Sequence, residues 1–158
     1  MLSSCRVIDC TDDRGQLAGL VLAQLGAEVV LVEPPGGSPA RRRPPLAGGR
    51  PGPENGLWHW AYNRGKRSVA LDLDTDAGRS RLSALAAGAD VLLWAGRPGE
   101  LPFAYDELAA VNPGLVMVIL TPFGLDGPKA DWADSDLVIC ASACQAALTG
   151  DSDLPPLR

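Results

Sequence analysis

Short apolar runs alternate along this chain with segments whose apolar residues recur at helical spacing. Residues 6–9 and 28–33 form two such runs, and between them Leu17, Leu20 and Val21 fall on one face of a helix. The predicted order is therefore strand, helix, strand. Because an apolar run of this kind suits a strand covered on both faces, the two strands are predicted to be parallel and joined by a right-handed crossover.

The same alternation continues through the rest of the chain. Three more strands are predicted at 68–72, 90–93 and 115–120, and three more helices at 75–87, 105–111 and 134–148. This order predicts an open parallel α/β sheet with helices on both faces. The most continuous runs predict its central strands, at 29–32, 69–71, 91–93 and 116–120. Ligands bind such sheets at the carboxyl ends of the strands, so we expect the site in the loops after Asp9, Glu33, Asp72 and Leu93.

The segment 34–57 follows neither a strand nor a helix period. It holds half of the chain's 14 prolines and the triplet Arg41, Arg42 and Arg43. These features predict a long exposed loop without a packing surface. A basic loop of this kind either reaches a phosphate group or forms a solvated arm, and the residues leave both interpretations open.

Composition limits the classes of protein to consider. The chain has 158 residues, a formal net charge of −5 and 5% aromatic residues. This size suits one domain, and the acidic balance argues against a nucleic-acid partner, whose binding protein would carry a basic surface. No apolar run reaches the ~20 residues of a membrane span, and the first residues lack the pattern of a secretory signal. We therefore expect a cytoplasmic protein with no membrane partner.

The cysteines and the histidine predict no metal site and no catalytic triad. Cys5 and Cys10, and Cys140 and Cys144, form no C-x-x-C pair, which disfavours zinc. Cys140 and Cys144 are spaced to share one helix face, as small buried thiols. His59 is the sole histidine and lies in a segment predicted to be a polar loop, without a nearby acid or nucleophile.

The first strand, its helix and Glu33 together imitate a dinucleotide-binding unit, in which an acid at this position holds the adenine ribose. The glycine fingerprint is absent, because only Gly15 lies between the strand and the helix. Asp12 and Asp13 also place negative charge where a pyrophosphate would approach the helix N-terminus. An NAD(P)-binding domain is thus the less favoured alternative.

Several blocks of sequence, in a fixed order, resemble one family. The three longest are residues 25–37 (LGAEVVLVEPPGG), 63–73 (NRGKRSVALDL) and 89–99 (ADVLLWAGRPG). Shorter blocks follow at 105–108, 112–115, 123–128, 136–137 and 148–150. Together they resemble the class III CoA-transferases, a family that includes formyl-CoA transferase, carnitine CoA-transferase and α-methylacyl-CoA racemase. The resemblance covers essentially the whole chain, and the Asn-x-x-Lys-Arg-Ser-x-x-Leu-Asp block is its most specific part.

The resemblance implies a fold and a set of partners. Family members have an N-terminal Rossmann-like large domain that binds coenzyme A, a small domain, and two interlocked subunits, in chains more than twice this length. We therefore expect residues 1–150 to form the N-terminal part of that large domain, which is incomplete here, and residues 151–158 to form a tail leading to a missing remainder. The implied substrates are an acyl-CoA and a carboxylic acid acceptor. The implied protein partner is a second copy, as a homodimer, or a complementary C-terminal chain.

The resemblance also implies covalent catalysis by a carboxylate. In the transferases an aspartate attacks the acyl-CoA thioester, and it follows elements that correspond here to Thr149-Gly150 and Pro155-Pro156. Asp151 and Asp153 precede the second element, so neither is assigned as the nucleophile. We expect this chain to lack the nucleophile and to be inactive alone. The alternative is a truncated, non-catalytic fragment that binds CoA or a partner.

The contacts to coenzyme A that the resemblance implies come from three loops. They are Asp12, Asp13 and Arg14 after the first strand, Leu71 and Asp72 at the end of the third, and Ala95, Gly96 and Arg97 after the fourth. Arg14 and Arg97 are the preferred phosphate ligands, because the planar guanidinium donates two parallel hydrogen bonds. Ala95 stands where the family usually has Asn. Lys66 and Arg67 match the family, but we assign them to the structure of the sheet edge and leave them outside the site.

One position separates the transferases from the racemases within this resemblance. The racemases have a histidine directly before the Asp that corresponds to Asp136, whereas this chain has Ser135. A serine hydroxyl is too weak an acid and too weak a base to exchange an α-proton at neutral pH. The resemblance therefore implies a transferase.

Overall fold

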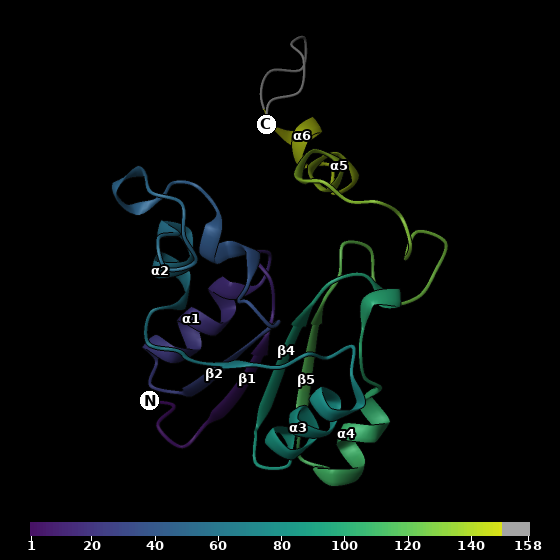
Figure 1. The fold of residues 1–158 in the computed structure, drawn as a ribbon. Coiled ribbons are helices and arrows are strands. Elements are labelled where there is room, and N and C mark those ends of the chain that lie inside the picture. The colour runs from purple at the N-terminus through teal and green to yellow at the C-terminus, as the bar shows by residue number, and fades with distance from the viewer. Residues whose placement is uncertain (150–158) are drawn as a thin grey trace. The chain divides into compact units, whose positions relative to one another are not determined.

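Five parallel strands form one sheet. The computed structural model describes residues 1–149. Its strands are β1 (Arg6–Cys10), β2 (Glu28–Glu33), β3 (Arg67–Ala70), β4 (Val91–Ala95) and β5 (Val116–Leu120), and Figure 1 shows their arrangement. They lie in the order β3-β2-β1-β4-β5, and every neighbouring pair is parallel. The parallel α/β fold that the alternation predicts is confirmed.

The strands β3 and β5 lie at the edges of the sheet, so the prediction that both are central was wrong. In β5, Met117 and Ile119 pack against the core, whereas Val116, Val118 and Leu120 are exposed. An apolar run can therefore mark an edge strand with one covered face as well as a strand covered on both faces.

Helices cover both faces of the sheet. On one face, Val7, Val29 and Leu93 pack with Leu22 and Ala23 of helix α1 (Gln16–Gln24). Helix α1 ends at Gln24, and Gly26 follows with a φ of 100°, a conformation that glycine adopts without steric cost and that turns the chain into β2. The crossover predicted from the first apolar runs is thus present.

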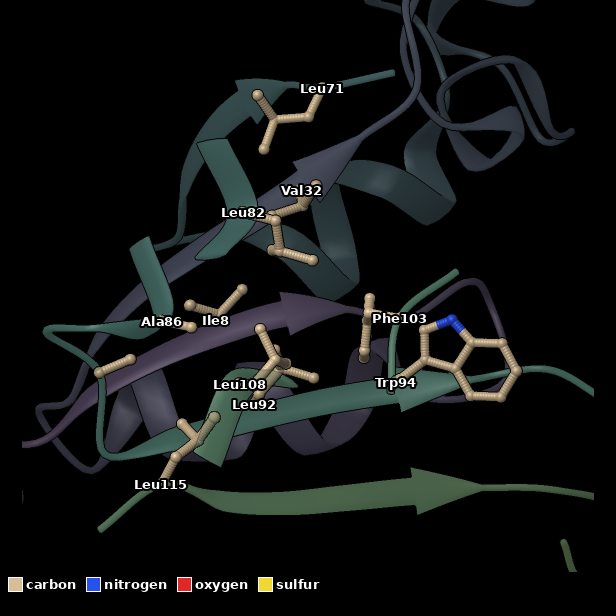
Figure 2. Packing of buried hydrophobic residues seen from close by; sticks show 11 residues of the cluster. Ile8, Val32, Leu71, Leu82, Ala86, Leu92, Trp94, Phe103, Leu108 and Leu115 are labelled. Atoms are coloured by element: carbon tan, nitrogen blue, oxygen red, sulfur yellow. The ribbon is translucent and has the colours of Figure 1, made fainter. Parts of the chain in front are cut away.

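The larger core lies on the other face. Leu82 and Ala86 of helix α3 (Asp76–Ala86) and Leu108 of helix α4 (Tyr105–Val111) pack over Ile8 and Leu92 of the sheet, as Figure 2 shows. Leucine, valine and alanine supply most of this core, as expected for a chain with few aromatic residues. The helices predicted at 75–87 and 105–111 are confirmed within a residue at each end.

Most of the segment 34–57 is exposed, as predicted, but it contains short helices and buried residues, so the prediction that it has no packing surface was wrong. It contains the short 3₁₀ helices η1 (Pro39–Arg42) and η2 (Ala47–Gly49) and leads into helix α2 (Leu57–Asn63). Ser38 caps η1 by accepting a hydrogen bond from the Ala40 N–H, and Ala40 is buried. His59 therefore lies on a helix, whereas a polar loop was predicted.

The chain divides into two compact units. The first consists of residues 1–96 and 100–120 and contains the whole sheet, and the second includes residues 97–99 and, of the described residues, 121–149. The second unit includes helices α5 (Asp136–Ser142) and α6 (Gln145–Leu148). A third short 3₁₀ helix, η3, spans Pro98–Glu100. Within residues 1–149, no helix is both long and apolar enough to cross a membrane.

The single helix predicted over 134–148 was wrong, because the backbone leaves the helical conformation at Cys144. This residue has a φ of 59°, in the left-handed region, and it separates α5 from α6. Cys140 and Cys144 therefore do not share the face of one helix. Cys144 is exposed, and Cys140 is half-buried. No glycine or proline marks the break, so the helical pattern gives no sign of it.

The core on the α3 face predicts a large loss of stability from one truncation. Leu82 is 1% exposed, so Leu82→Ala removes buried methyl groups and leaves a cavity, and we expect the free energy of unfolding to fall by about 3 kcal/mol. Leu85, on the exposed side of the same helix, provides the control, and Leu85→Ala should cost less than about 1 kcal/mol. Urea denaturation followed by circular dichroism measures both. Equal losses for the two variants would contradict the assigned packing of α3.

Candidate functional site

A cavity of about 310 Å³ opens among the carboxyl ends of β1, β2 and β3. Its lining comes from the loops in which the sequence places the site. The lining residues are Cys10, Thr11, Asp12, Val32, Glu33, Pro34, Ser38, Pro39, Leu71, Asp72, Leu73, Asp74 and Ala95. All of them belong to the first compact unit. The site is therefore built on loops that the parallel sheet brings to one edge.

The cavity brings together half of the residues predicted to contact a ligand. Asp12, Leu71, Asp72 and Ala95 line it. Asp13, Arg14 and Gly96 lie next to these in sequence but are not among the lining residues. Arg97 belongs to the second compact unit. The roles of all eight residues as ligand contacts stay predictions.

Both acidic residues before helix α1 pair with arginines. Arg14 Nε lies 2.8 Å from Asp12 Oδ2, and Arg14 Nη2 lies 2.5 Å from the same oxygen. Asp13 pairs with Arg43, whose guanidinium also lies 4.3 Å from the ring centroid of Trp58. A ligand phosphate would therefore compete with Asp12 for the guanidinium of Arg14.

The turn after β3 is held against the start of α3. The Asp72 carbonyl accepts hydrogen bonds from the Thr75 N–H (3.2 Å) and hydroxyl (2.7 Å), and the Thr75 hydroxyl in turn caps α3 by accepting from the Gly78 N–H. A Cβ at Gly78 would overlap the Asp72 carbonyl oxygen, so only glycine allows this close approach. The carboxyl end of β3 thus presents Leu71 and Asp72 to the cavity in a fixed turn.

The carboxylate of Glu33 is fully used within the protein. It is 2% exposed and accepts hydrogen bonds from the Ser38 N–H (2.8 Å), Arg41 Nε (2.6 Å), Arg41 Nη2 (2.7 Å) and the Ser68 hydroxyl (2.5 Å). Burial alone would raise the pKa of Glu33, but these hydrogen bonds outweigh it and hold the pKa at about 2. An acid so occupied is a poor acceptor for the ribose of a dinucleotide, which weakens the NAD(P) alternative further.

Gly96 has a packing role of its own. A Cβ at this position would lie 2.5 Å from two carbons of the Trp94 indole. The Gly96 N–H donates to the Leu120 carbonyl (3.0 Å), which continues the pairing of β4 with β5. The indole that packs on Gly96 therefore explains why this position needs glycine. The predicted ligand contact of Gly96 is a separate matter.

Lys66 forms a buried ion pair with Asp9. The side chain of Lys66 is 1% exposed, and its ammonium lies 2.7 Å from Asp9 Oδ2, 2.9 Å from the Gln16 carbonyl oxygen and 2.9 Å from Asn63 Oδ1. The Asn63 amide nitrogen also lies 3.2 Å from His59 Nδ1. Burial and the nearby Arg41 charge lower the pKa of His59.

Comparison with known proteins decides the family. The family model of CoA-transferase family III matches residues 2–158. The chain belongs to CoA-transferase family III. The resemblance stated from the sequence blocks is therefore confirmed.

The curated relatives of this family member are CoA-transferases by name. The chain is 41% identical over 157 residues to succinyl-CoA:(R)-benzylsuccinate CoA-transferase subunit BbsE of Thauera aromatica, covering 97% of this chain and 38% of that protein. It is 42% identical over 146 residues to the probable fatty acyl-CoA transferase Rv3272 of Mycobacterium tuberculosis, covering 90% of this chain and 36% of that protein. The chain thus spans about two fifths of the length of the curated relatives it matches.

Solved structures of family III proteins share the fold. A CaiB/BaiF family protein from Brucella suis superposes with a TM-score of 0.86 at 32% identity, over 99% of this chain and 42% of that one. The orthorhombic form of Rv3272 from M. tuberculosis superposes with a TM-score of 0.84 at 38% identity, over 99% of this chain and 44% of that one. The open parallel sheet is therefore the fold of this part of the family.

Sequence reasoning missed the buried ion pair of Asp9 and Lys66 in this family III chain. It noted the block that contains Asn63 and Lys66 but assigned Lys66 to the sheet edge, whereas its ammonium lies under the start of α1. An acid at the end of the apolar run 6–9 was the available signal, because a carboxylate there needs a buried partner. Among residues 1–149, no group of His, Cys, Asp and Glu side chains is arranged to hold a metal ion.

The lowered pKa of Glu33 predicts how stability depends on pH. The pKa falls from 4.5 to about 2 on folding, so its contribution is fully present above pH 4.5 and is lost as the pH falls toward 2. The contribution at neutral pH is roughly 3 kcal/mol. In Glu33→Gln, the free energy of unfolding should vary less between pH 4.5 and 2 than in the wild type.

The control for this measurement is Glu54→Gln, which changes the exposed partner of the same arginine. Its unfolding free energy should follow the wild-type pH dependence. Denaturant titrations at half-unit pH intervals provide both curves. If Glu33→Gln kept the full wild-type slope below pH 4.5, the assigned ionisation of Glu33 would be wrong.

Proposed function

We propose that this chain is the CoA-binding N-terminal portion of a class III CoA-transferase, an enzyme that moves CoA between an acyl-CoA and a carboxylic acid. The observation that carries the proposal is the cavity at the carboxyl ends of β1, β2 and β3, in a chain that belongs to this family. It lies where parallel α/β sheets bind their ligands. The names of the relatives, which are CoA-transferases, support the same reaction class.

The chemistry of the lining suits the adenosine end of CoA. Among the described residues that line the cavity, none is lysine or arginine, and Val32, Leu71 and Leu73 supply apolar surface for a flat ring. The carboxylates of Asp72 and Asp74 can accept hydrogen bonds from an amino or hydroxyl group. The adenine ring therefore enters the cavity in this proposal.

The phosphate groups then lie outside the cavity, because the described residues of its lining supply no cation. Arg14, which lies in the loop before α1 and pairs with Asp12, is one proposed ligand, and Arg97 is the other. Binding to Arg14 exchanges its carboxylate partner for a phosphate, which keeps the guanidinium paired with an anion. Asp13, Gly96 and Ala95 complete the proposed contacts through the loops that carry them.

The carboxylate nucleophile is assigned to no described residue. The family resemblance places that aspartate after Pro155-Pro156, and we propose that catalysis requires it together with the rest of the large domain and the small domain. A second copy of the chain or a complementary C-terminal chain is the proposed protein partner. We also propose a cytoplasmic location for the protein.

The reaction proposed is transfer, because Ser135 cannot serve as the racemase base. Its hydroxyl caps α5 by accepting a hydrogen bond from the Val138 N–H at 3.3 Å. We expect a full-length protein containing this chain to exchange no deuterium from solvent into the α-position of a 2-methylacyl-CoA. Mass spectrometry of the recovered thioester measures this. Incorporation at the rate of CoA transfer would overturn the assignment.

CoA binding by the chain itself tests the proposed site. We expect calorimetric titration to detect CoA binding, and Ala95→Leu to weaken it at least tenfold because the larger side chain fills part of the cavity. Ala84→Leu is the matched control, since Ala84 is exposed on α3 and lines a different cavity, with Arg6 and Glu28. That variant should bind CoA within twofold of the wild type.

Two outcomes would contradict the proposal. No binding of wild-type chain at millimolar CoA would remove the proposed function from this chain. Equal affinities for Ala95→Leu and the wild type would move the CoA site away from the cavity. An acyl-exchange assay on the same samples should show no turnover, and measurable turnover would mean that the nucleophile lies within residues 1–158.

A further inference from the structure

Lys66 joins three segments that are distant in sequence. Its ammonium donates to Asp9 at the end of β1, to the carbonyl of Gln16 at the start of α1, and to Asn63 at the end of α2. An ammonium has three N–H donors, so all three are used. The protein alone supplies the partners of the ammonium, and the side chains of Lys66 and Asp9 are 1% and 0% exposed to solvent.

The same network holds both ends of the loop between β1 and α1. Asp9 Oδ1 accepts from the Thr11 N–H (3.0 Å) and the Thr11 hydroxyl (2.6 Å), while Asp9 Oδ2 accepts from Lys66. The first residue of the loop, Thr11, therefore bonds to Asp9. Gln16, which follows the loop, bonds to Lys66. Thr11 and Asp12, within the loop, line the cavity.

Two further contacts fix this arrangement. The Asn63 amide donates to Gln16 Oε1 at 3.0 Å, so α2 bonds to the first residue of α1 twice, directly and through Lys66. Gly19 of α1 lies against the ion pair, since a Cβ there would overlap Asp9 Oδ2 and lie 2.8 Å from Lys66 Nζ. The helix thus keeps a residue with low helix propensity where the pair requires space.

Stability alone does not account for a buried ion pair. Removing two charges from water costs about as much as their attraction returns, and well-packed apolar residues often stabilise a fold as much or more. What the pair supplies is geometry, because each donor and acceptor has one position. In this chain it fixes the two ends of residues 11–15, of which Thr11 and Asp12 line the cavity.

We propose that Lys66 is a positioning residue for CoA binding, acting through Asp9 and Gln16 to hold the loop of residues 11–15 in the conformation that the ligand meets. The proposal rests on the proposed function for its ligand. Its structural half, the positioning of the loop, is independent of CoA. Lys66 itself does not touch the ligand in this assignment.

The test uses a variant in which the charges remain balanced. Lys66→Met alone would leave the Asp9 carboxylate buried without a partner and could unfold the chain. Asp9→Asn combined with Lys66→Met removes both charges, keeps an oxygen that accepts from Thr11, and removes the links to Gln16 and Asn63. Arg67→Met is the matched control, because it removes the positive charge of the neighbouring residue. The side chain of Arg67 is 76% exposed and pairs with Glu28.

Two readouts separate positioning from a general loss of structure. Hydrogen exchange of the amides of residues 11–16 should become at least tenfold faster in the double variant, while the amides of β2 and β4 keep their protection. The calorimetric Kd for CoA should rise at least tenfold in the double variant and less than twofold in Arg67→Met. Circular dichroism confirms that both variants are folded.

Each outcome decides the proposal. Unchanged exchange at residues 11–16, exchange that accelerates equally in all strands, or an unchanged Kd in a folded double variant would overturn it. If the wild-type chain binds no CoA, the proposed function fails, and the exchange experiment still tests the loop. Faster exchange confined to residues 11–16 would then support positioning without a CoA role. If the double variant is unfolded, the exchange pattern of Asn63→Ala decides in the same way, because this variant removes the hydrogen bonds of Asn63 to Lys66, Gln16 and His59 but no charge.

Discussion

The buried ion pair between Lys66 and Asp9 is the interaction on which the arrangement of the candidate site depends. It connects residues 57 positions apart, and it spans from the end of β1 to the residue before β3, although β2 lies between these strands in the sheet. Loss of one partner would leave the other charge buried, at a cost of about 3–5 kcal/mol. The start of α1 and the end of α2 bond to this pair, so both helices take their places from it.

A second charged pair organises the proline-rich segment in a similar way. Arg41 binds Glu33 through two guanidinium nitrogens, and Ser38 and Ser68 bond to the same carboxylate. The segment therefore packs at the carboxyl end of β2, where Ser38 and Pro39 become walls of the cavity. In both cases a buried acid at the end of a strand determines the path of the loop that follows.

Much of the fold could be predicted from periodicity, but the polar interior could not. Apolar runs mark the strands at 28–33 and 116–120. The start of helix α3 is marked by the capping hydroxyl of Thr75, three residues before the Gly78 amide. The partners of Lys66 and Arg41 depend on tertiary distances, which no local period encodes. The break at Cys144 carries no glycine or proline, so the helix there was extended too far. Family resemblance, rather than spacing, supplied the residues at the cavity, and four of its eight choices line it.

CoA is proposed to enter the cavity at the carboxyl ends of β1, β2 and β3. A crystal structure of the chain with CoA would locate the ligand. We expect electron density for the adenine ring between Thr11 and the turn of Leu71 and Asp72, with the Asp9–Lys66 pair intact beneath the loop. Adenine density elsewhere on the chain, with this cavity empty at a saturating concentration of CoA, would contradict it.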